Sequence, residues 1–106
     1  MSDGKKPVHP GEVLAEELTE IGINASDLAR RLLVPNNRIY HIVQGRRSVT
    51  ADTALRLAKV FNTTPEYWLN LQASYELDLA RQEVDEILEN IQPYSSPEAV
   101  QSKMNL

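Results

Sequence analysis

The segment from Pro35 to Gln44 carries the side chains best suited to recognition chemistry. At about 100° per residue, Ile39, Ile42 and Val43 fall on one narrow helical face, which we expect to be buried. The remaining positions present amide, imidazole, phenol and guanidinium groups and no carboxylate: Asn36, Asn37, Arg38, Tyr40, His41 and Gln44. Amides pair with adenine and guanidinium groups with guanine in the major groove of DNA. The pattern predicts a DNA-reading face, and ordinary polar surface is the alternative.

Charge is distributed unevenly along the chain, although its formal net value is only −4. Residues 28–59 hold seven Arg and Lys residues against one acid, Asp52, whereas both flanking segments are acidic. A basic middle segment suits a phosphate backbone as its partner. We expect phosphate contacts from side chains that flank the reading face and begin the preceding helix: Asn24, Ser26, Arg46 and Arg47.

The elements that position these side chains are five or six helices, without a convincing strand, so the predicted fold class is all-α. The first three helices are expected at Pro10–Ile21, Ala25–Leu32 and Pro35–Gln44. A fourth begins at the cap Thr50, and its predicted inner face is Ala54, Leu55, Leu57, Ala58 and Phe61. A fifth begins after Thr64, and its helical pattern continues through an acidic stretch to Ile91.

The second and third helices are short and joined by a tight turn, as in a helix-turn-helix. The motifs around them resemble those of the HigA/VapI-type antitoxins, in the XRE group of phage-repressor-like proteins. The runs that match are His-Pro-Gly-Glu at 9–12, Val-Pro at 34–35, Gly-Arg-Arg at 45–47, Thr-Ala-Asp-Thr-Ala-Leu-Arg-Leu-Ala at 50–58 and Thr-Pro-Glu-Tyr-Trp-Leu-Asn-Leu-Gln at 64–72. The resemblance covers about residues 9–80.

This resemblance implies a five-helix domain that dimerises, binds operator DNA and represses its own operon. It also implies a partner, a RelE-like ribonuclease toxin of the HigB type. On the family pattern Gln44 takes a phosphate-contact position, and we expect base contacts from the side chains Asn36, Asn37, Arg38, Tyr40 and His41. We divide the chain into a helix-turn-helix domain at 1–75 and an acidic C-terminal helix with a flexible tail at 76–106.

The turn departs from the family pattern at one position. Related turns have glycine before Val-Pro, whereas this chain has Leu33. A leucine with a positive φ is strained. Either the turn is altered here, or Leu33 accepts the strain in return for a hydrophobic contact.

Aromatic and apolar residues of the fifth helix are candidates for an interface between two copies of the chain. They could stack on a ligand or a base, but their helical spacing favours core and dimer contacts. A two-fold symmetric repressor needs a self-complementary patch. We assign the dimer contact to Trp68, Leu71, Gln72 and Tyr75.

Several classes of function are disfavoured by the composition. The chain has no cysteine, and His9 with Glu12 supplies two possible metal ligands but no third. It also lacks a nucleophile triad, a paired-carboxylate site and a phosphate-binding glycine loop. We therefore expect no enzyme, no metal and no cofactor. A cytoplasmic location is expected because no apolar stretch is long enough for a signal or membrane segment.

The acidic stretch after residue 75 allows two interpretations. Its carboxylates surround an apolar stripe: Glu76, Asp78, Glu83, Asp85, Glu86 and Glu89. The stripe either extends the fold or the dimer, or it docks a basic toxin. The alternatives to an autoregulating antitoxin are therefore an orphan transcriptional regulator without a toxin, or an interaction module that acts through this helix.

Overall fold

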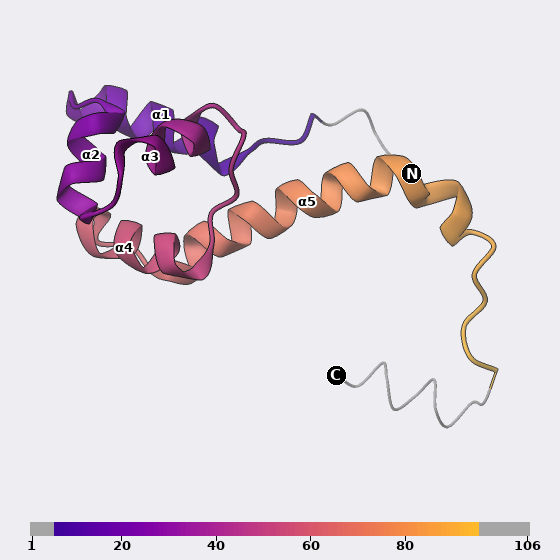
Figure 1. Ribbon diagram of the computed structural model, residues 1–106. Helices are drawn as coiled ribbons and strands as arrows, with labels where there is room; N and C mark the ends of the chain where they lie inside the picture. Colours follow the sequence, from indigo (N-terminus) through magenta and orange to yellow (C-terminus); the bar gives the residue numbers. More distant parts are fainter. Residues whose placement is uncertain (1–5, 96–106) are drawn as a thin grey trace.

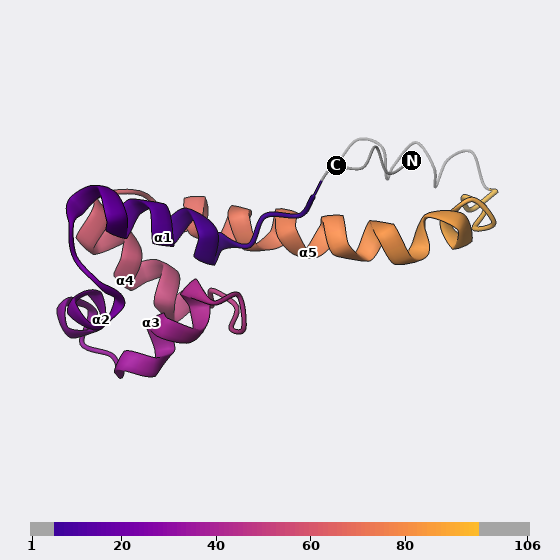
Figure 2. The same cartoon turned by 90° about the horizontal axis from the view of Figure 1, so that it is seen from above.

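The computed structural model describes residues 6–95, and these form five helices and no strand, which confirms the all-α fold class. The helices are α1 (Pro10–Ile21), α2 (Ala25–Leu32), α3 (Asn36–Val43), α4 (Ala51–Phe61) and α5 (Pro65–Leu88). α1 to α4 form a cluster at one end of the molecule, and α5 leads away from it (Figures 1 and 2).

Local capping explains most of the helix boundaries. At α2, the Asn24 side chain accepts from the Asp27 amide at 2.8 Å, and the Asp27 carboxylate accepts from the Asn24 amide at 3.3 Å. Threonine hydroxyls cap α4 and α5 in the predicted way. The third helix is two residues shorter than predicted, because extended Pro35 is its N-cap and Gln44 its C-cap.

The core lies between α1, α2, α3, α4 and the first half of α5. Its fully buried members include Leu14, Leu28, Ile39, Ile42 and Leu57. The prediction that Leu55 packs inward is wrong, since its side chain is 61% exposed. The buried face of α4 is Thr53, Ala54, Leu57 and Ala58, and Leu55 lies about 100° from Ala54 around the helix.

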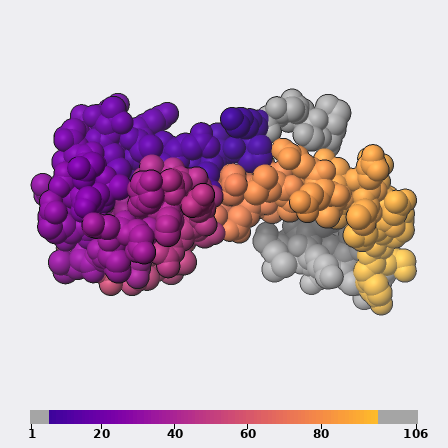
Figure 3. Space-filling view, turned by 45° about the horizontal axis from the view of Figure 1, so that its top comes forward, coloured from indigo at the N-terminus to yellow at the C-terminus, as the bar shows by residue number. Residues whose placement is uncertain are grey.

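α5 is a single uninterrupted helix of 24 residues, which makes it about 36 Å long. Its first half packs on α4 and α1, whereas its second half extends from the body as an arm (Figures 1 and 3). The helical pattern expected to Ile91 ends at Leu88, followed by a turn. Of the acidic helix and flexible tail predicted at 76–106, the structure describes residues up to Ser95, and the remainder lies outside the described residues. Among residues 6–95, no helix has the length and apolar composition needed to cross a membrane.

Candidate nucleic-acid interface

α3 buries its apolar face and turns its polar face outward. Ile39 and Ile42 are fully buried beneath it. Asn36 and Asn37 are exposed on the opposite side, and the Tyr40 side chain is 54% exposed. His41 is half-buried, with its ring centroid 6.1 Å from that of Tyr40. The helix therefore presents two amides and a phenol to solvent, together with a partly exposed imidazole.

The turn before α3 keeps the conformation of a glycine-containing turn although leucine occupies it. Leu33 has φ 61° and ψ 43°, and its amide donates to the Arg30 carbonyl at 3.2 Å. Its side chain is 84% exposed, so the strain brings no buried hydrophobic contact. The α2–α3 geometry is thus that of a helix-turn-helix, with the turn neither altered nor stabilised by packing of Leu33.

The opposite end of α3 is held by a close contact with the start of α1. A Cβ on Gly11 would lie 1.8 Å from the carbonyl oxygen of Ile42, so only glycine fits there. His9 caps α1 by accepting from the Gly11 amide through Nδ1 at 2.8 Å, and Glu12 completes the capping box. The His9 ring packs edge-on against the Tyr75 ring of α5, with 4.8 Å between the two ring centroids.

This capping role depends on a neutral imidazole. Burial lowers the pKa of His9, while the charge of Glu12 and the backbone of Arg47 oppose that shift. A protonated Nδ1 could not accept from the Gly11 amide. The contact between α1 and α3 therefore includes a titratable group, His9, which the sequence offered only as one of two possible metal ligands.

The predicted phosphate-contact residues lie in two places, the segment that leaves α3 and the start of α2. Gln44, Arg46 and Arg47 are exposed in the segment that leaves α3. Asn24 is exposed at the start of α2 but its side chain is committed to the cap, and Ser26 is half-buried. Arg46 and Arg47 are thus the two members of this set that offer an exposed positive charge to a phosphate.

Arg38 differs from its neighbours on α3 because its guanidinium is already paired. Its Nη1 donates to the Asp52 carboxylate of α4 at 2.6 Å, and Arg56 Nε donates to the same oxygen at 3.0 Å. These two hydrogen bonds hold the pKa of Asp52 below its usual range, and the bond from Arg56 has the larger effect. This network was not predicted from the sequence, although Asp52 is the one acid of the basic stretch 28–59.

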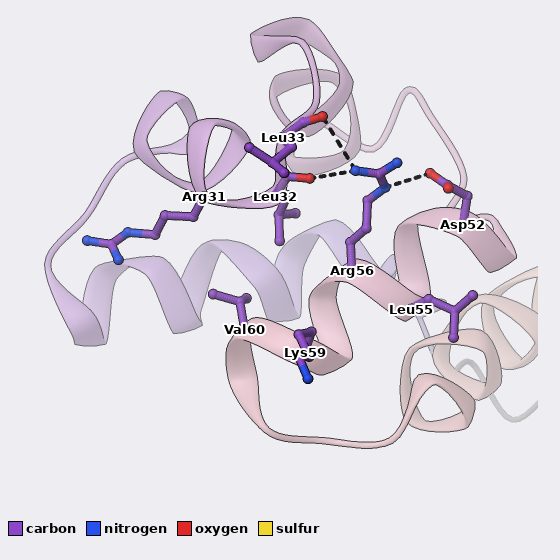
Figure 4. Close-up of a pocket in the computed structure, with 8 residues that line it drawn as sticks. All are labelled: Arg31, Leu32, Leu33, Asp52, Leu55, Arg56, Lys59 and Val60. Atoms are coloured by element: carbon purple, nitrogen blue, oxygen red, sulfur yellow. Dashed lines mark hydrogen bonds and ion pairs between the residues drawn. The ribbon is translucent and has the colours of Figure 1, made fainter.

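Arg56 extends the network to the turn before α3. Its Nη1 donates to the Leu32 carbonyl at 2.7 Å and reaches the Leu33 carbonyl at 3.4 Å (Figure 4). Carbonyls at the end of a helix lack partners within it, so Arg56 satisfies the end of α2. One carboxylate on α4 is therefore joined, through two arginines, to α3 and to the end of α2.

A surface groove lies beside this network, between α2 and α4. Arg31, Leu33, Leu55, Lys59 and Val60 line it together with Arg56 and Asp52 (Figure 4). Its lining combines exposed leucines with three cationic side chains. The groove lies outside the predicted set of functional residues.

The four residues predicted for a dimer contact divide into two groups. Trp68 is only 2% exposed, and its indole N–H donates to the Thr63 hydroxyl at 3.0 Å. Gln72 is buried and accepts from the Val49 amide at 2.8 Å. Leu71 and Tyr75 are half-buried. Trp68 and Gln72 thus serve the fold of one chain, and they leave little surface for a second.

A helix-turn-helix family model matches residues 14–68, which span α1 to the start of α5. The chain belongs to the XRE-type helix-turn-helix family. This is a family of regulators and antitoxins, not of enzymes. The resemblance stated from the motifs is therefore confirmed.

Relatives within this family include both sequences and solved structures. Virulence-associated protein I of Dichelobacter nodosus is 46% identical, over 76% of this chain and 75% of its own length. An addiction module antidote protein of the HigA family from Coxiella burnetii is 50% identical, with a TM-score of 0.82, over 85% of this chain and 100% of that one. The antitoxin GraA in complex with its operator is 43% identical, with a TM-score of 0.80, over 91% of this chain and 99% of that one.

Proposed function

We propose that this protein is a sequence-specific DNA-binding repressor that acts as a dimer on the promoter of its own operon. α3 enters the major groove, and α2 crosses the phosphate backbone. Asn36, Asn37, Tyr40 and His41 read base edges, while Arg46, Arg47 and Gln44 contact phosphates. The bound dimer blocks transcription sterically.

The observation that carries this proposal is the outward-facing polar side of α3 above its buried Ile39 and Ile42. Amides on an exposed helix, with arginines directly after its end, match the chemistry of the major groove and its phosphate edges. The related antitoxin GraA, solved with its operator, supports this interpretation.

The test is binding of the purified protein to the DNA upstream of its own gene, over a range of salt concentrations. We expect one inverted repeat to be protected, with half-sites about 34 Å apart, and an affinity that falls steeply with salt. Equal affinity for this DNA and for a scrambled duplex of the same length would contradict a sequence-specific repressor.

We also place the dimer contact on α5. The second half of this helix carries an apolar stripe with no cover among the described residues, and Leu77 on it is 51% exposed. Leu71 and Tyr75, which were also predicted for the dimer contact, lie about 120° and about 200° from Leu77 around the helix, on a second face that continues to Leu79. An α5–α5 contact would make the patch self-complementary, as a two-fold axis requires. The boundary drawn at residues 75 and 76 then separates two roles within one continuous helix.

A second function, as antitoxin to a RelE-like ribonuclease, is supported by the names of the relatives and by the acidic outer faces of α5. A small basic toxin encoded beside this gene would be its partner. Co-expression of both proteins, with the complex recovered at moderate salt and growth restored, tests this. Growth arrest that persists despite a folded, abundant protein would leave the orphan regulator as the better assignment.

A further inference from the structure

We propose that Asp52 restrains Arg38 and thereby limits the affinity of the protein for DNA of any sequence. The inference rests on the proposed DNA-binding function and goes beyond it. It assigns to an acidic residue on α4 control over a cation that lies on the reading helix. Asp52 acts through Arg38, so it is a positioning residue and makes no DNA contact itself.

The geometry commits the Arg38 side chain to α4. Arg38 follows exposed Asn37 on α3, and its Nη1 is 2.6 Å from Asp52 Oδ2 on α4. An unpaired arginine at this place would be free to contact a phosphate at the groove edge. The bonded carboxylate neutralises it and turns it toward the body.

The carboxylate is itself held in place by a second arginine. Arg56 donates to the same Asp52 oxygen at 3.0 Å, and it is anchored at its other end by the Leu32 carbonyl at 2.7 Å. Figure 4 shows Arg56 between Asp52 and the end of α2. Asp52 therefore cannot swing away with Arg38 toward DNA without giving up this anchored pair.

The position of Asp52 in the charge pattern supports the same interpretation. It is the only acid among residues 28–59, which otherwise hold seven basic residues. A carboxylate in that stretch works against phosphate binding, and simple solubility does not require it in a protein of net charge −4. Control of a neighbouring cation gives it a specific role at the cost of some DNA affinity.

The experiment measures binding of a scrambled, non-operator duplex to wild type and to Asp52→Asn across a salt series. We expect the slope of log affinity against log salt to steepen by about 0.9, the value for one additional neutralised phosphate. The ratio of the two affinities should accordingly grow about 3.5-fold when salt is lowered from about 200 to about 50 mM.

Glu66→Gln is the matched control for charge. Glu66 is also an acid in the first turn of a helix that follows a threonine cap, and it has no ion pair among the described residues. The variant changes net charge by the same amount, so its slope should stay at the wild-type value. An equal change in both variants would reduce the effect to net charge and overturn the proposal.

The Arg38→Ala variant tests whether Asp52→Asn acts by releasing Arg38 or only by removing a negative charge. In the Arg38→Ala background, Asp52→Asn should leave the slope unchanged, because the cation to be released is absent. Persistence of the steeper slope in this double variant would overturn the proposal. So would an Asp52→Asn slope equal to or shallower than that of wild type.

Thermal unfolding of each variant shows whether it is folded at the temperature of the binding measurement. If Asp52→Asn does not fold, Arg38→Ala alone decides: it should keep the wild-type slope, whereas Arg46→Ala should lower it by about 0.9. A loss of slope in Arg38→Ala would overturn the proposal. Failure of wild type to bind any duplex would overturn the proposed function as well, so the two failures are distinguishable.

Discussion

At the scale of single residues, neighbours on α3 have opposite tasks. Ile39 and Ile42 anchor the helix in the core, and Asn36 and Asn37 face solvent. Arg38 lies between these groups and is committed to Asp52. A helix of only eight residues therefore holds core positions, exposed positions proposed to read bases, and an arginine paired with α4, so substitutions only one residue apart should have unlike effects.

Asn37 and Arg46 should differ in the kind of binding that they support. Asn37→Ala should relax discrimination at one base pair by ~1–3 kcal/mol, since an amide reads a base edge. Arg46→Ala should weaken binding to DNA of every sequence alike, and it should reduce the slope of log affinity against log salt by about 0.9. Titration of an operator library against both variants measures this. A uniform loss in both would remove the base-reading role of Asn37.

His9 should make the stability of the fold depend on pH. Its pKa is lowered in the folded state by burial, so the unfolded state binds the proton more readily. The contribution of neutral His9 is complete above the ordinary histidine pKa of about 6.5 and is lost as pH falls below it. The free energy of unfolding should therefore decrease between pH 7 and pH 5.

Urea unfolding at a series of pH values measures this dependence. His9→Asn keeps an N-cap acceptor without the titrating ring, so it should be less stable at pH 7 and show a smaller decrease toward pH 5. The same pH dependence in this variant and in wild type would assign the effect to other groups.

At the scale of elements, two backbone positions determine how α3 is held. Gly11 allows the start of α1 to touch the Ile42 carbonyl at one end of α3. Leu33 adopts a left-handed conformation in the turn at the other end. Both are features of the backbone, and their substitution should affect α3 without altering any side chain on it.

Gly11→Ala should destabilise the protein by about 1–3 kcal/mol, as overpacking does, because its Cβ would meet backbone and not a flexible side chain. Displacement of α3 should also weaken operator binding in the fraction that remains folded. Gly22→Ala is the control, since its positive φ causes strain but nothing lies within 4 Å of the new Cβ. Unfolding and DNA titration of both variants test this. Weakened operator binding in Gly22→Ala of the same size would contradict a specific effect on α3.

Leu33→Gly should stabilise the fold. A left-handed non-glycine residue costs roughly 1–2 kcal/mol, and the greater chain entropy of glycine offsets about 0.5–1 kcal/mol of the gain. Because the leucine side chain is 84% exposed, little packing is lost. Leu33→Ala keeps the Cβ and should leave the unfolding free energy near that of wild type. A less stable Leu33→Gly protein would show that the exposed leucine has a stabilising contact.

At the scale of the whole molecule, α1 to α4 and the first half of α5 form a compact body, from which the second half of α5 extends as an arm (Figure 3). The body holds α3, the proposed reading helix, and the arm exposes an apolar stripe that is uncovered among the described residues. A DNA-binding protein that recognises an inverted repeat needs two reading helices at a defined separation. In the proposed dimer, contact between two such arms would set this separation.

Leu77→Glu should therefore convert the dimer to a monomer, with loss of about 2 kcal/mol for each leucine removed from the interface. Sedimentation velocity should show the change while the melting of the body is retained, and operator affinity should fall. Leu79→Glu is the matched control, because Leu79 is 40% exposed on the opposite face of α5. Dissociation by both variants, or by neither, would contradict a contact through the Leu77 stripe.

The sequence by itself determined the helices and the division of α3 into two faces. Caps such as Asn24 with Asp27 act over three residues, and helical periodicity extends over about two turns, so both are readable without a fold. Only the tertiary structure decided which polar and charged side chains are paired with groups on other helices. Arg38 and Asp52 are 14 residues apart, Arg56 and Leu32 are 24, and His9 meets Tyr75 from the other end of the domain. Contacts of this kind depend on how helices pack, and no local pattern encodes them.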